Sequence, residues 1–358
     1  MSIKVAIVGA GEVVKNVHLP SWREMRDVDV AAICDINEDA ARSVASCWKI
    51  PRYYAQFEEL LDCEKPFLVD ICTPPTTHPA LVVQALEAGC NILLEKPLAV
   101  TIEESDQIIR AYRQRKDKRL KLGVIHNFLF WPPILNMYAK VKRGEIGDII
   151  GVEIKAFSTQ NDPLLSDPEH WCHSLPGGRY GEGLIHLVYL LYHFLGALEI
   201  RSLWVAKRGS YPWVDYDELF ITFSAGGRFG SIYNSFNSPV DNAPVITIYG
   251  TKSQLEFESY DWTILTRRSV SNGAFNKAMN ILHEIYQLSR SLGINTFNKT
   301  IAGRTKTGHS IYFPLFIDSI VNGKELPLDP EEAYEANRVF LEVISELEKA
   351  RTEKLNQS

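Results

Sequence analysis

The chain has 358 residues, of which 46% are hydrophobic and 23% are charged. These values are typical of a globular protein and exclude a disordered chain or a miniprotein held together by disulfides. Thirty-eight basic and 44 acidic residues give a net charge of −6, so the overall charge favours neither nucleic acid nor an anionic membrane as a partner. At roughly 150 residues per domain, the length predicts two domains.

The six cysteines include no Cys-x-x-Cys pair, and Cys34 and Cys72 lie in apolar runs where buried thiols are expected. Met1 leads directly into a predicted strand without the pattern of a signal peptide. No apolar run reaches the roughly 18 residues that a membrane span needs. We therefore expect a cytoplasmic protein without membrane contact.

The first third of the chain alternates apolar strands with helices. Such an alternation predicts a parallel sheet that is covered on both faces, as in a doubly wound α/β domain of the Rossmann type. We expect this domain to span residues 1–125. Its predicted strands are 3–8, 28–34, 68–72, 91–94 and 121–125. The first predicted helix follows the first strand and ends near residue 25, and the other predicted helices cover 38–47, 79–88 and 102–115.

After residue 125 the pattern changes to strands in which apolar and polar residues alternate. Alternation buries one face of a strand and favours antiparallel pairing, so residues 126–358 predict an α+β domain with an open, mostly antiparallel sheet. An open sheet face favours a homodimer or homotetramer. The predicted strands are 149–157, 200–205, 218–223, 229–236, 245–249 and 254–257, and the predicted helices are 133–142, 184–195 and 330–349.

Residues 263–312 carry seven basic residues and one acidic residue, Glu284. Within this segment, residues 274–292 predict an amphipathic helix. Two interpretations remain open: a solvated insertion, or a patch that binds anionic lipid or a phosphorylated ligand.

The first predicted strand leads into Gly-Ala-Gly-Glu-Val-Val at residues 9–14, where a helix begins. Gly9 permits a tight turn, and Gly11 lets the backbone approach a pyrophosphate at the helix N-terminus. Val14 replaces the third glycine of this fingerprint. Asp35 ends the second strand, where a carboxylate accepts hydrogen bonds from ribose hydroxyls and repels a 2′-phosphate. The sequence therefore predicts NAD, in preference to NADP, bound by Gly9, Gly11, Glu12, Val13 and Asp35.

Two further strand ends carry Asp-Ile-Cys-Thr-Pro-Pro-Thr-Thr-His at residues 70–78 and Glu-Lys-Pro-Leu-Ala at residues 95–99. Together with the glycine turn and His-Leu-Pro at residues 18–20, they resemble the Gfo/Idh/MocA oxidoreductases, the family of glucose–fructose oxidoreductase and inositol dehydrogenase. The resemblance implies that Glu95 contacts the nicotinamide ribose. It also implies that Lys96, aimed by a cis peptide before Pro97, polarises the reacting carbonyl. The other cofactor contacts that we expect are Thr73 and Pro74, which would line the nicotinamide, and His78, at the start of a helix.

A carboxylate precedes a histidine by four residues at Glu182 and His186, which places both on one helix face. In the family, this helix faces the nicotinamide. A neutral His186 would take the hydroxyl proton during oxidation and return it during reduction. Glu182 would orient the ring or bind a substrate hydroxyl. Family members usually carry Asp in place of Glu182 and often in place of Tyr189. The alternative for His186 is a histidine of the apolar core.

Trp171 is suited to stacking on a sugar face, and Arg179 to holding a carboxylate or phosphate. The remaining candidate substrate contacts are Asn127, His173 and Tyr180. His170, Cys172 and His173 are zinc-binding residue types. Their spacing is a weak signal, however, and the family needs no metal, so we expect none.

These residues predict an NAD(P)-dependent dehydrogenase or reductase. Its expected small-molecule substrate is the secondary alcohol or ketone of a sugar, a sugar derivative or a cyclitol. Two alternatives remain open. An NAD-dependent glycosidase would oxidise and re-reduce its sugar in a closed cycle, and a non-catalytic sensor would bind NAD(H) without turnover.

Overall fold

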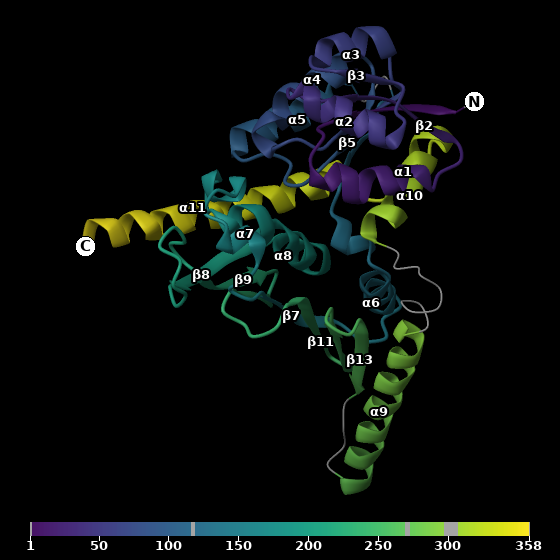
Figure 1. Ribbon diagram of the computed structural model, residues 1–358. Coiled ribbons are helices and arrows are strands. Elements are labelled where there is room, and N and C mark those ends of the chain that lie inside the picture. The colour runs from purple at the N-terminus through teal and green to yellow at the C-terminus, as the bar shows by residue number, and fades with distance from the viewer. Residues whose placement is uncertain (1, 116–118, 269–272, 297–306, 358) are drawn as a thin grey trace. The chain divides into compact units, whose positions relative to one another are not determined.

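The computed structural model describes residues 2–115, 119–268, 273–296 and 307–357. The chain divides into two units, each with its own sheet (Figure 1). The first unit contains residues 1–130 and 307–338, and the second contains residues 131–306 and 339–358. This division differs from the one predicted at residue 125, because the segment 307–338 returns to the first unit.

The first unit contains a six-stranded, fully parallel sheet with the order β3-β2-β1-β4-β5-β6. The predicted doubly wound Rossmann sheet is therefore confirmed. Every residue of β4 and β5 is buried, which explains why all of them except Asp70 and Asn91 are apolar. The strands are β1 (Ile3–Val8), β2 (Val28–Cys34), β3 (Arg52–Tyr54), β4 (Leu68–Ile71), β5 (Asn91–Leu94) and β6 (Leu122–Val124).

The helices of the first unit include two α-helices that the sequence did not predict, α3 (Phe57–Glu64) and α10 (Gly308–Asn322). Helix α10 belongs to this unit because its aromatic side chains pack there. The rings of Phe313 and Trp22 lie 4.4 Å apart between centroids, and those of Tyr312 and Phe130 lie 4.6 Å apart. The other helices are η1 (Val14–His18), α1 (Leu19–Arg23), α2 (Glu38–Trp48), η2 (Pro75–Thr77), α4 (His78–Glu87), α5 (Ile102–Arg113), η4 (Asn127–Phe130) and the start of α11 (Pro330–Gln357).

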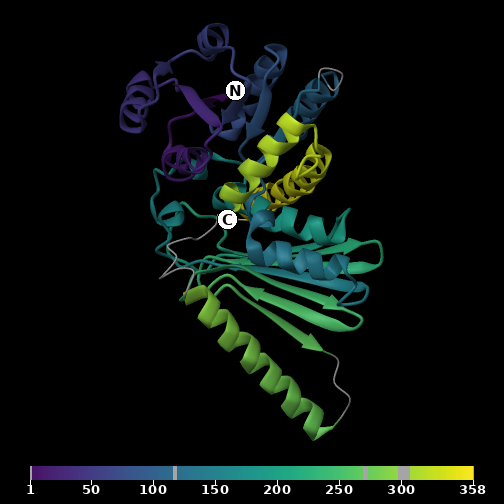
Figure 2. The ribbon, with the colours of Figure 1, turned by 90° about the vertical axis from the view of Figure 1, so that its right-hand side faces the viewer.

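The second unit contains a seven-stranded sheet with the order β13-β12-β11-β7-β10-β9-β8. Only β7 and β10 pair in parallel, so the predicted mostly antiparallel sheet is confirmed. Helices α6 and α8 pack on one face of it (Figure 2), while Trp204, Phe220 and Phe229 remain exposed. The strands are β7 (Ile149–Phe157), β8 (Glu199–Ala206), β9 (Glu218–Ala225), β10 (Arg228–Ser235), β11 (Asn242–Gly250), β12 (Ser253–Glu258) and β13 (Thr263–Arg268).

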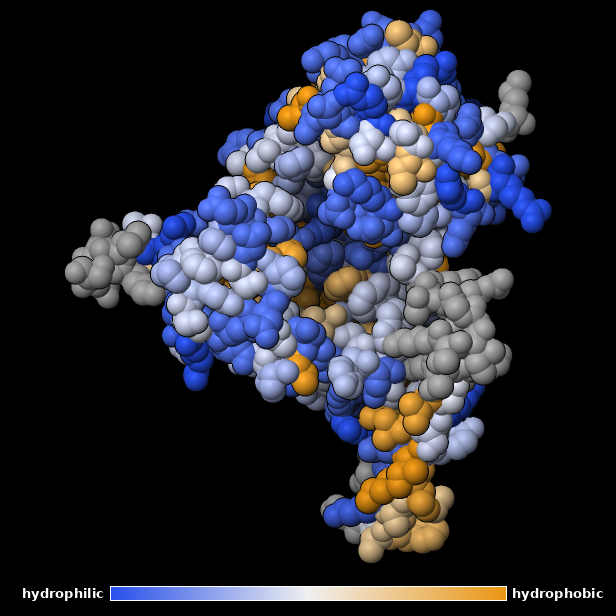
Figure 3. All heavy atoms as spheres, in the orientation of Figure 1, coloured by the Kyte–Doolittle hydropathy of each residue, from blue (hydrophilic) through white to orange (hydrophobic). Residues whose placement is uncertain are grey.

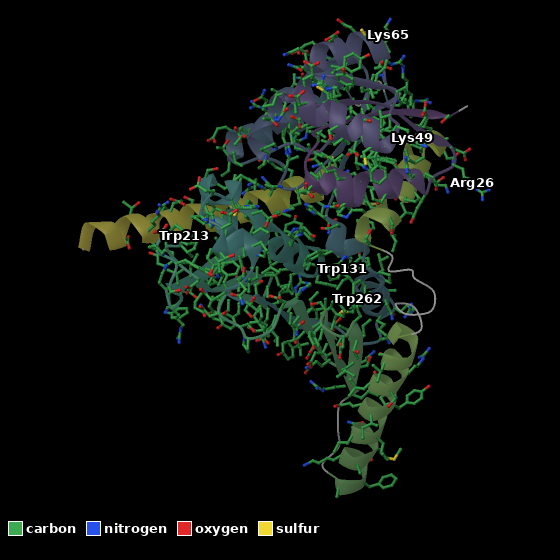
Figure 4. All side chains as sticks on the ribbon, in the orientation of Figure 1. Arg26, Lys49, Lys65, Trp131, Trp213 and Trp262 are labelled. Carbon is green, nitrogen blue, oxygen red and sulfur yellow. The ribbon has the colours of Figure 1, made fainter. Side chains whose placement is uncertain are left out.

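Two tryptophans pack against each other, one just before α6 and one just before β13. Trp131 stacks on Trp262 with ring centroids 5.0 Å apart (Figure 4).

In the described part of the chain, no helix combines the length and the hydropathy of a membrane span. The helices of this unit are α6 (Pro132–Lys142), α7 (Pro163–Ser166), η5 (Trp171–Ser174), α8 (Arg179–Leu195), α9 (Ala274–Thr296) and the remainder of α11.

Candidate functional site

The glycine turn after β1 has the geometry that a dinucleotide-binding turn needs. Gly9 has a φ of +107°, and a Cβ there would lie 2.6 Å from the carbonyl oxygen of Cys72. At Gly11, a Cβ would meet no atom within 4 Å. The first glycine is therefore required by the backbone, and the second leaves open space beside a helix N-terminus. These residues fit a bound dinucleotide.

Asp35, at the end of β2, holds this turn in place. One carboxylate oxygen accepts a hydrogen bond from the Ala10 N–H at 2.8 Å, and the other accepts one from the Asn37 N–H at 2.8 Å. The contact of Asp35 with ribose stays a prediction. Glu12 is exposed and pairs with Lys15 at 2.9 Å, while Val13 is half-buried.

His78 links the two loops that carry the family motifs. Its ring is fully buried, with Nδ1 3.0 Å from the carbonyl oxygen of Pro97 and Nε2 3.1 Å from that of Thr73. Burial lowers the pKa of His78, which favours the neutral ring. The structure thus places His78 inside the protein, where it positions both loops, and not at an exposed cofactor surface. The Lys96–Pro97 peptide bond is cis, as expected. In the other loop, beside Pro74, Thr73 Oγ1 lies 2.7 Å from Thr77 Oγ1.

A buried hydrogen-bonded cluster underlies the Glu-Lys-Pro loop. At its centre, His18 Nδ1 lies 2.9 Å from Asp70 Oδ2, and His18 Nε2 lies 2.9 Å from Glu95 Oε1. The Trp22 indole N–H donates to Asp70 at 2.7 Å. The Cys72 Sγ lies 3.2 Å from His18 Nδ1. His18 is therefore an imidazole held between two carboxylates away from solvent.

Glu95 is bound on both of its oxygens. Oε1 faces His18 and also His309 Nε2, at 3.1 Å, and Oε2 accepts the backbone N–H of Lys96 at 3.0 Å. Burial alone would raise the pKa of Glu95, but hydrogen bonds from the two histidines hold it well below its ordinary value. Burial likewise disfavours a charged His18, yet Asp70 holds the pKa of that ring well above its ordinary value. The cluster thus contains a buried ion pair directly beside Lys96.

Two groups in this cluster have ligand atoms close enough to surround a metal: His18, Asp70 and Cys72, and His18, Glu95 and His309. The His18 nitrogens, however, lie at hydrogen-bonding distances of 2.9 Å from the carboxylate oxygens. A shared proton suffices to hold atoms at that separation. The arrangement therefore matches a proton-linked network.

On α8, His186 is oriented by a tyrosine. Its Nδ1 lies 2.8 Å from the Tyr189 hydroxyl, and Tyr189 is buried. The carboxylate of Glu182 accepts a hydrogen bond from Arg179 at 2.8 Å. Arg179 also pairs with Asp162 at 3.0 Å. The guanidinium predicted to hold a substrate anion is thus already neutralised by two carboxylates.

The other predicted substrate residues have different environments. Tyr180 is only 3% exposed and packs on Phe236 with ring centroids 4.9 Å apart, so it belongs to the core and not to an open surface. Trp171, in η5, is 48% exposed, as a stacking residue requires. His173 lies in η5 and is half-buried, and Asn127 is half-buried in η4.

Sequence reasoning missed His309 and Trp22, and it used His18 and Asp70 only for the resemblance. His309 is 214 residues from Glu95 along the chain, and no motif surrounds it. The sequence did contain one signal for this cluster. Residues two apart in a strand face the same side, so Asp70 and Cys72, at the end of an apolar strand, turn two polar side chains toward one face.

The fold and these residues define an oxidoreductase with a Rossmann unit for a nicotinamide dinucleotide. The model of an oxidoreductase family with an NAD-binding Rossmann fold matches residues 3–123, and the model of the GFO/IDH/MocA C-terminal domain matches residues 134–256. The chain belongs to the Gfo/Idh/MocA family and is an enzyme of the dehydrogenase and reductase type.

Individual relatives are distant. The chain is 24% identical to "Oxidoreductase P35" of Formosa agariphila, over 75% of this chain and 83% of that protein. It is 29% identical to the D-glucoside 3-dehydrogenase of Escherichia coli, over 41% of each chain. Among solved structures, the WlbA dehydrogenase of Bordetella pertussis, in complex with NADH and UDP-GlcNAcA, superimposes with a TM-score of 0.77 at 18% identity. That match covers 99% of this chain and 96% of the other.

Proposed function

We propose that this protein is an NAD-dependent dehydrogenase or reductase acting on a secondary alcohol or ketone of a sugar, sugar derivative or cyclitol. The observation that carries the proposal is the Glu95–Lys96 pair after β5, where a carboxylate locked by two imidazoles fixes the backbone of the lysine. Relatives named D-glucoside 3-dehydrogenase, D-apiose dehydrogenase and levoglucosan dehydrogenase support a sugar-like substrate.

Lys96 would stabilise negative charge on the reacting oxygen. Bound NAD would supply the hydride acceptor for the carbon that bears this oxygen. An ammonium group aimed at the oxygen lowers the barrier when negative charge develops there. Glu95 supports this role. Its carboxylate already has hydrogen-bonding partners of its own, and it also accepts the backbone N–H of Lys96 at 3.0 Å, which fixes the backbone of the lysine.

His186 would exchange the hydroxyl proton. A general base needs one ring nitrogen without a proton. If Nδ1–H donates to the Tyr189 hydroxyl, 2.8 Å away, Nε2 is left as the acceptor. Tyr189 thus takes the orienting role that the sequence assigned to Glu182.

A screen of turnover tests this proposal. NAD and NADP are offered with polyols, sugars, nucleotide sugars and hydroxy acids while NADH absorbance is followed. Lys96→Ala and His186→Ala should each lower kcat by about 10²–10⁴-fold and leave the Kd for NADH unchanged. Lys252→Ala, a change at an exposed lysine between β11 and β12, is the matched control and should be silent. Loss of NADH binding in the first two variants, or full turnover in both, would contradict the assigned roles.

The same screen separates the two alternatives. A closed-cycle glycosidase would retain NAD through purification and release a sugar without net NADH. A sensor would bind NADH and turn over none of the alcohols.

NAD is proposed over NADP because of the Asp35 carboxylate at the end of β2. Asp35→Ser should raise the KM for NAD at least 10-fold and lower the KM for NADP, since the charge that repels a 2′-phosphate is removed. An unchanged ratio of the two KM values would show that Asp35 does not select the cofactor.

We also propose a homo-oligomer that pairs through the open face of the second sheet, where Trp204, Phe220 and Phe229 are exposed. Exposed aromatic side chains are enriched at interfaces. A cytoplasmic location is proposed because all six cysteines are free thiols, as in a reducing compartment.

A further inference from the structure

Helix α9 turns its polar side toward the protein. It lies along β13, the edge strand of the second sheet. Gln287 accepts from the Thr266 N–H at 2.9 Å and donates to the Thr266 carbonyl at 3.3 Å. Asn280 donates to the Arg268 carbonyl at 3.3 Å. The carboxamides of α9 therefore satisfy the backbone groups that an edge strand leaves unpaired.

The polar side carries one ion pair as well. Glu284 accepts from Arg267 Nε at 3.2 Å, and Arg267 also pairs with Glu256 of β12. Amide and carboxylate groups are thus required on the side that meets β13. This requirement explains why an amphipathic helix directs its apolar side away from its own sheet.

The apolar side of α9 is exposed (Figure 3). Eight large apolar residues on it are between 42% and 76% exposed. They form two adjoining rows with spacings of three and four residues, and at about 100° per residue both rows fit within half of the helix circumference. No Asp, Glu, Lys or Arg lies in that half. The first row is Phe275, Met279, Leu282 and Tyr286, and the second is Ile281, Ile285, Leu288 and Leu292.

This surface, which we call the α9 apolar face, has the size of an interface. At roughly 200 Å² for each fully exposed side chain, the face presents about 900 Å². The largest apolar patch on a typical monomer is about 300–600 Å². A standard interface buries about 800 Å² on each partner. The α9 apolar face alone is therefore sufficient for a stable contact.

We propose that the α9 apolar face binds the same face of a second copy of this chain, as a two-fold pair of helices. Rows with a seven-residue repeat suit packing of one helix against another, and an uncharged apolar surface is complementary to itself. A helix that lies on an anionic membrane carries Lys and Arg on its polar side. Here that side carries two such residues, Lys277 and Arg290, while its Asn280, Glu284 and Gln287 are bound to β13, so this side faces the sheet. This contact is separate from the open sheet face and does not depend on the proposed reaction.

The particle mass in solution tests this inference. In the double variant Leu282→Lys/Ile285→Lys, the number of chains per particle should fall by half in sedimentation velocity, and the dissociation constant should rise about 100-fold or more. Val240→Lys/Val321→Lys adds the same charge at exposed valines outside α9 and should leave the mass unchanged. Far-UV circular dichroism confirms that both variants are folded. A monomeric native protein, or a mass unaffected by the first variant, overturns the proposal.

Cross-linking locates the contact on α9. Cys47 and Cys63 are exposed, so both are first replaced with serine. In that background, Leu282→Cys should form a covalent dimer on oxidation, and Val240→Cys should not. Equal cross-linking of the two variants overturns the proposal. So does native protein that is monomeric and floats with phosphatidylserine vesicles, because a lipid surface would then occupy the face.

Discussion

Replacing His18 with alanine would leave two buried carboxylates without the cation between them. The imidazole faces Asp70 and Glu95, each at 2.9 Å, and it is inaccessible to solvent. Removing one partner of a buried ion pair costs about 3–5 kcal/mol. His309 contacts only one of these carboxylates, at 3.1 Å, and His309→Ala should cost about 1–3 kcal/mol. The free energy of unfolding of a domain is about 5–15 kcal/mol, so His18→Ala should remove a large share of it.

The pH dependence has a defined sign. The folded pKa of His18 is raised above its ordinary 6.5, so its contribution is complete below pH 6.5 and is lost as the pH rises through the folded value. The folded pKa of Glu95 is depressed below 4.5, so its contribution is complete above pH 4.5 and is lost as the pH falls through the folded value. The stability difference between native protein and His18→Ala should therefore be largest between about pH 4.5 and 6.5.

Urea unfolding followed by far-UV circular dichroism from pH 4 to pH 9 measures this difference. His18→Gln preserves most of the side-chain volume and should lose the same pH dependence, which separates lost charge from lost packing. A cost for His18→Ala no greater than that for His309→Ala would refute the reasoning. A difference in stability that does not vary with pH would refute it as well.

Two other changes test the site. Tyr189→Phe removes the partner of His186 and should lower kcat about 10–100-fold with the Kd for NADH unchanged; unaltered kcat would remove Tyr189 from the mechanism. Gly9→Ala places a Cβ 2.6 Å from the Cys72 carbonyl at a φ of +107°, and it should cost about 1–3 kcal/mol and weaken NADH binding at least 10-fold by titration. Gly89→Ala is its control, because Gly89 also has a positive φ but open space around it. Equal NADH affinities in the two alanine variants would show that the clash at Gly9 is unimportant.

Elements with a strong local pattern could be predicted from the sequence. The strand 149–157 matches β7 at both ends, because its apolar and polar residues alternate as one buried face requires. The glycine turn and the Glu-Lys-Pro loop could be assigned because their chemistry depends on short runs of neighbouring residues. In contrast, β3 has only three residues, none of them buried, so it carries no pattern to recognise. Strand β13 was hidden in a segment interpreted through its basic charge.

The sequence by itself determined the parallel sheet, the phosphate-binding turn, the position of Lys96 and the amphipathic character of residues 274–292. Only the tertiary structure decided which groups meet. It joined His309 to Glu95 across 214 residues, and it assigned Tyr189 to His186 and Arg179 to two carboxylates. It also turned the apolar side of α9 outward. Periodicity records which residues share a face of an element, whereas the partner of that face depends on contacts between distant segments, here the unpaired backbone of β13.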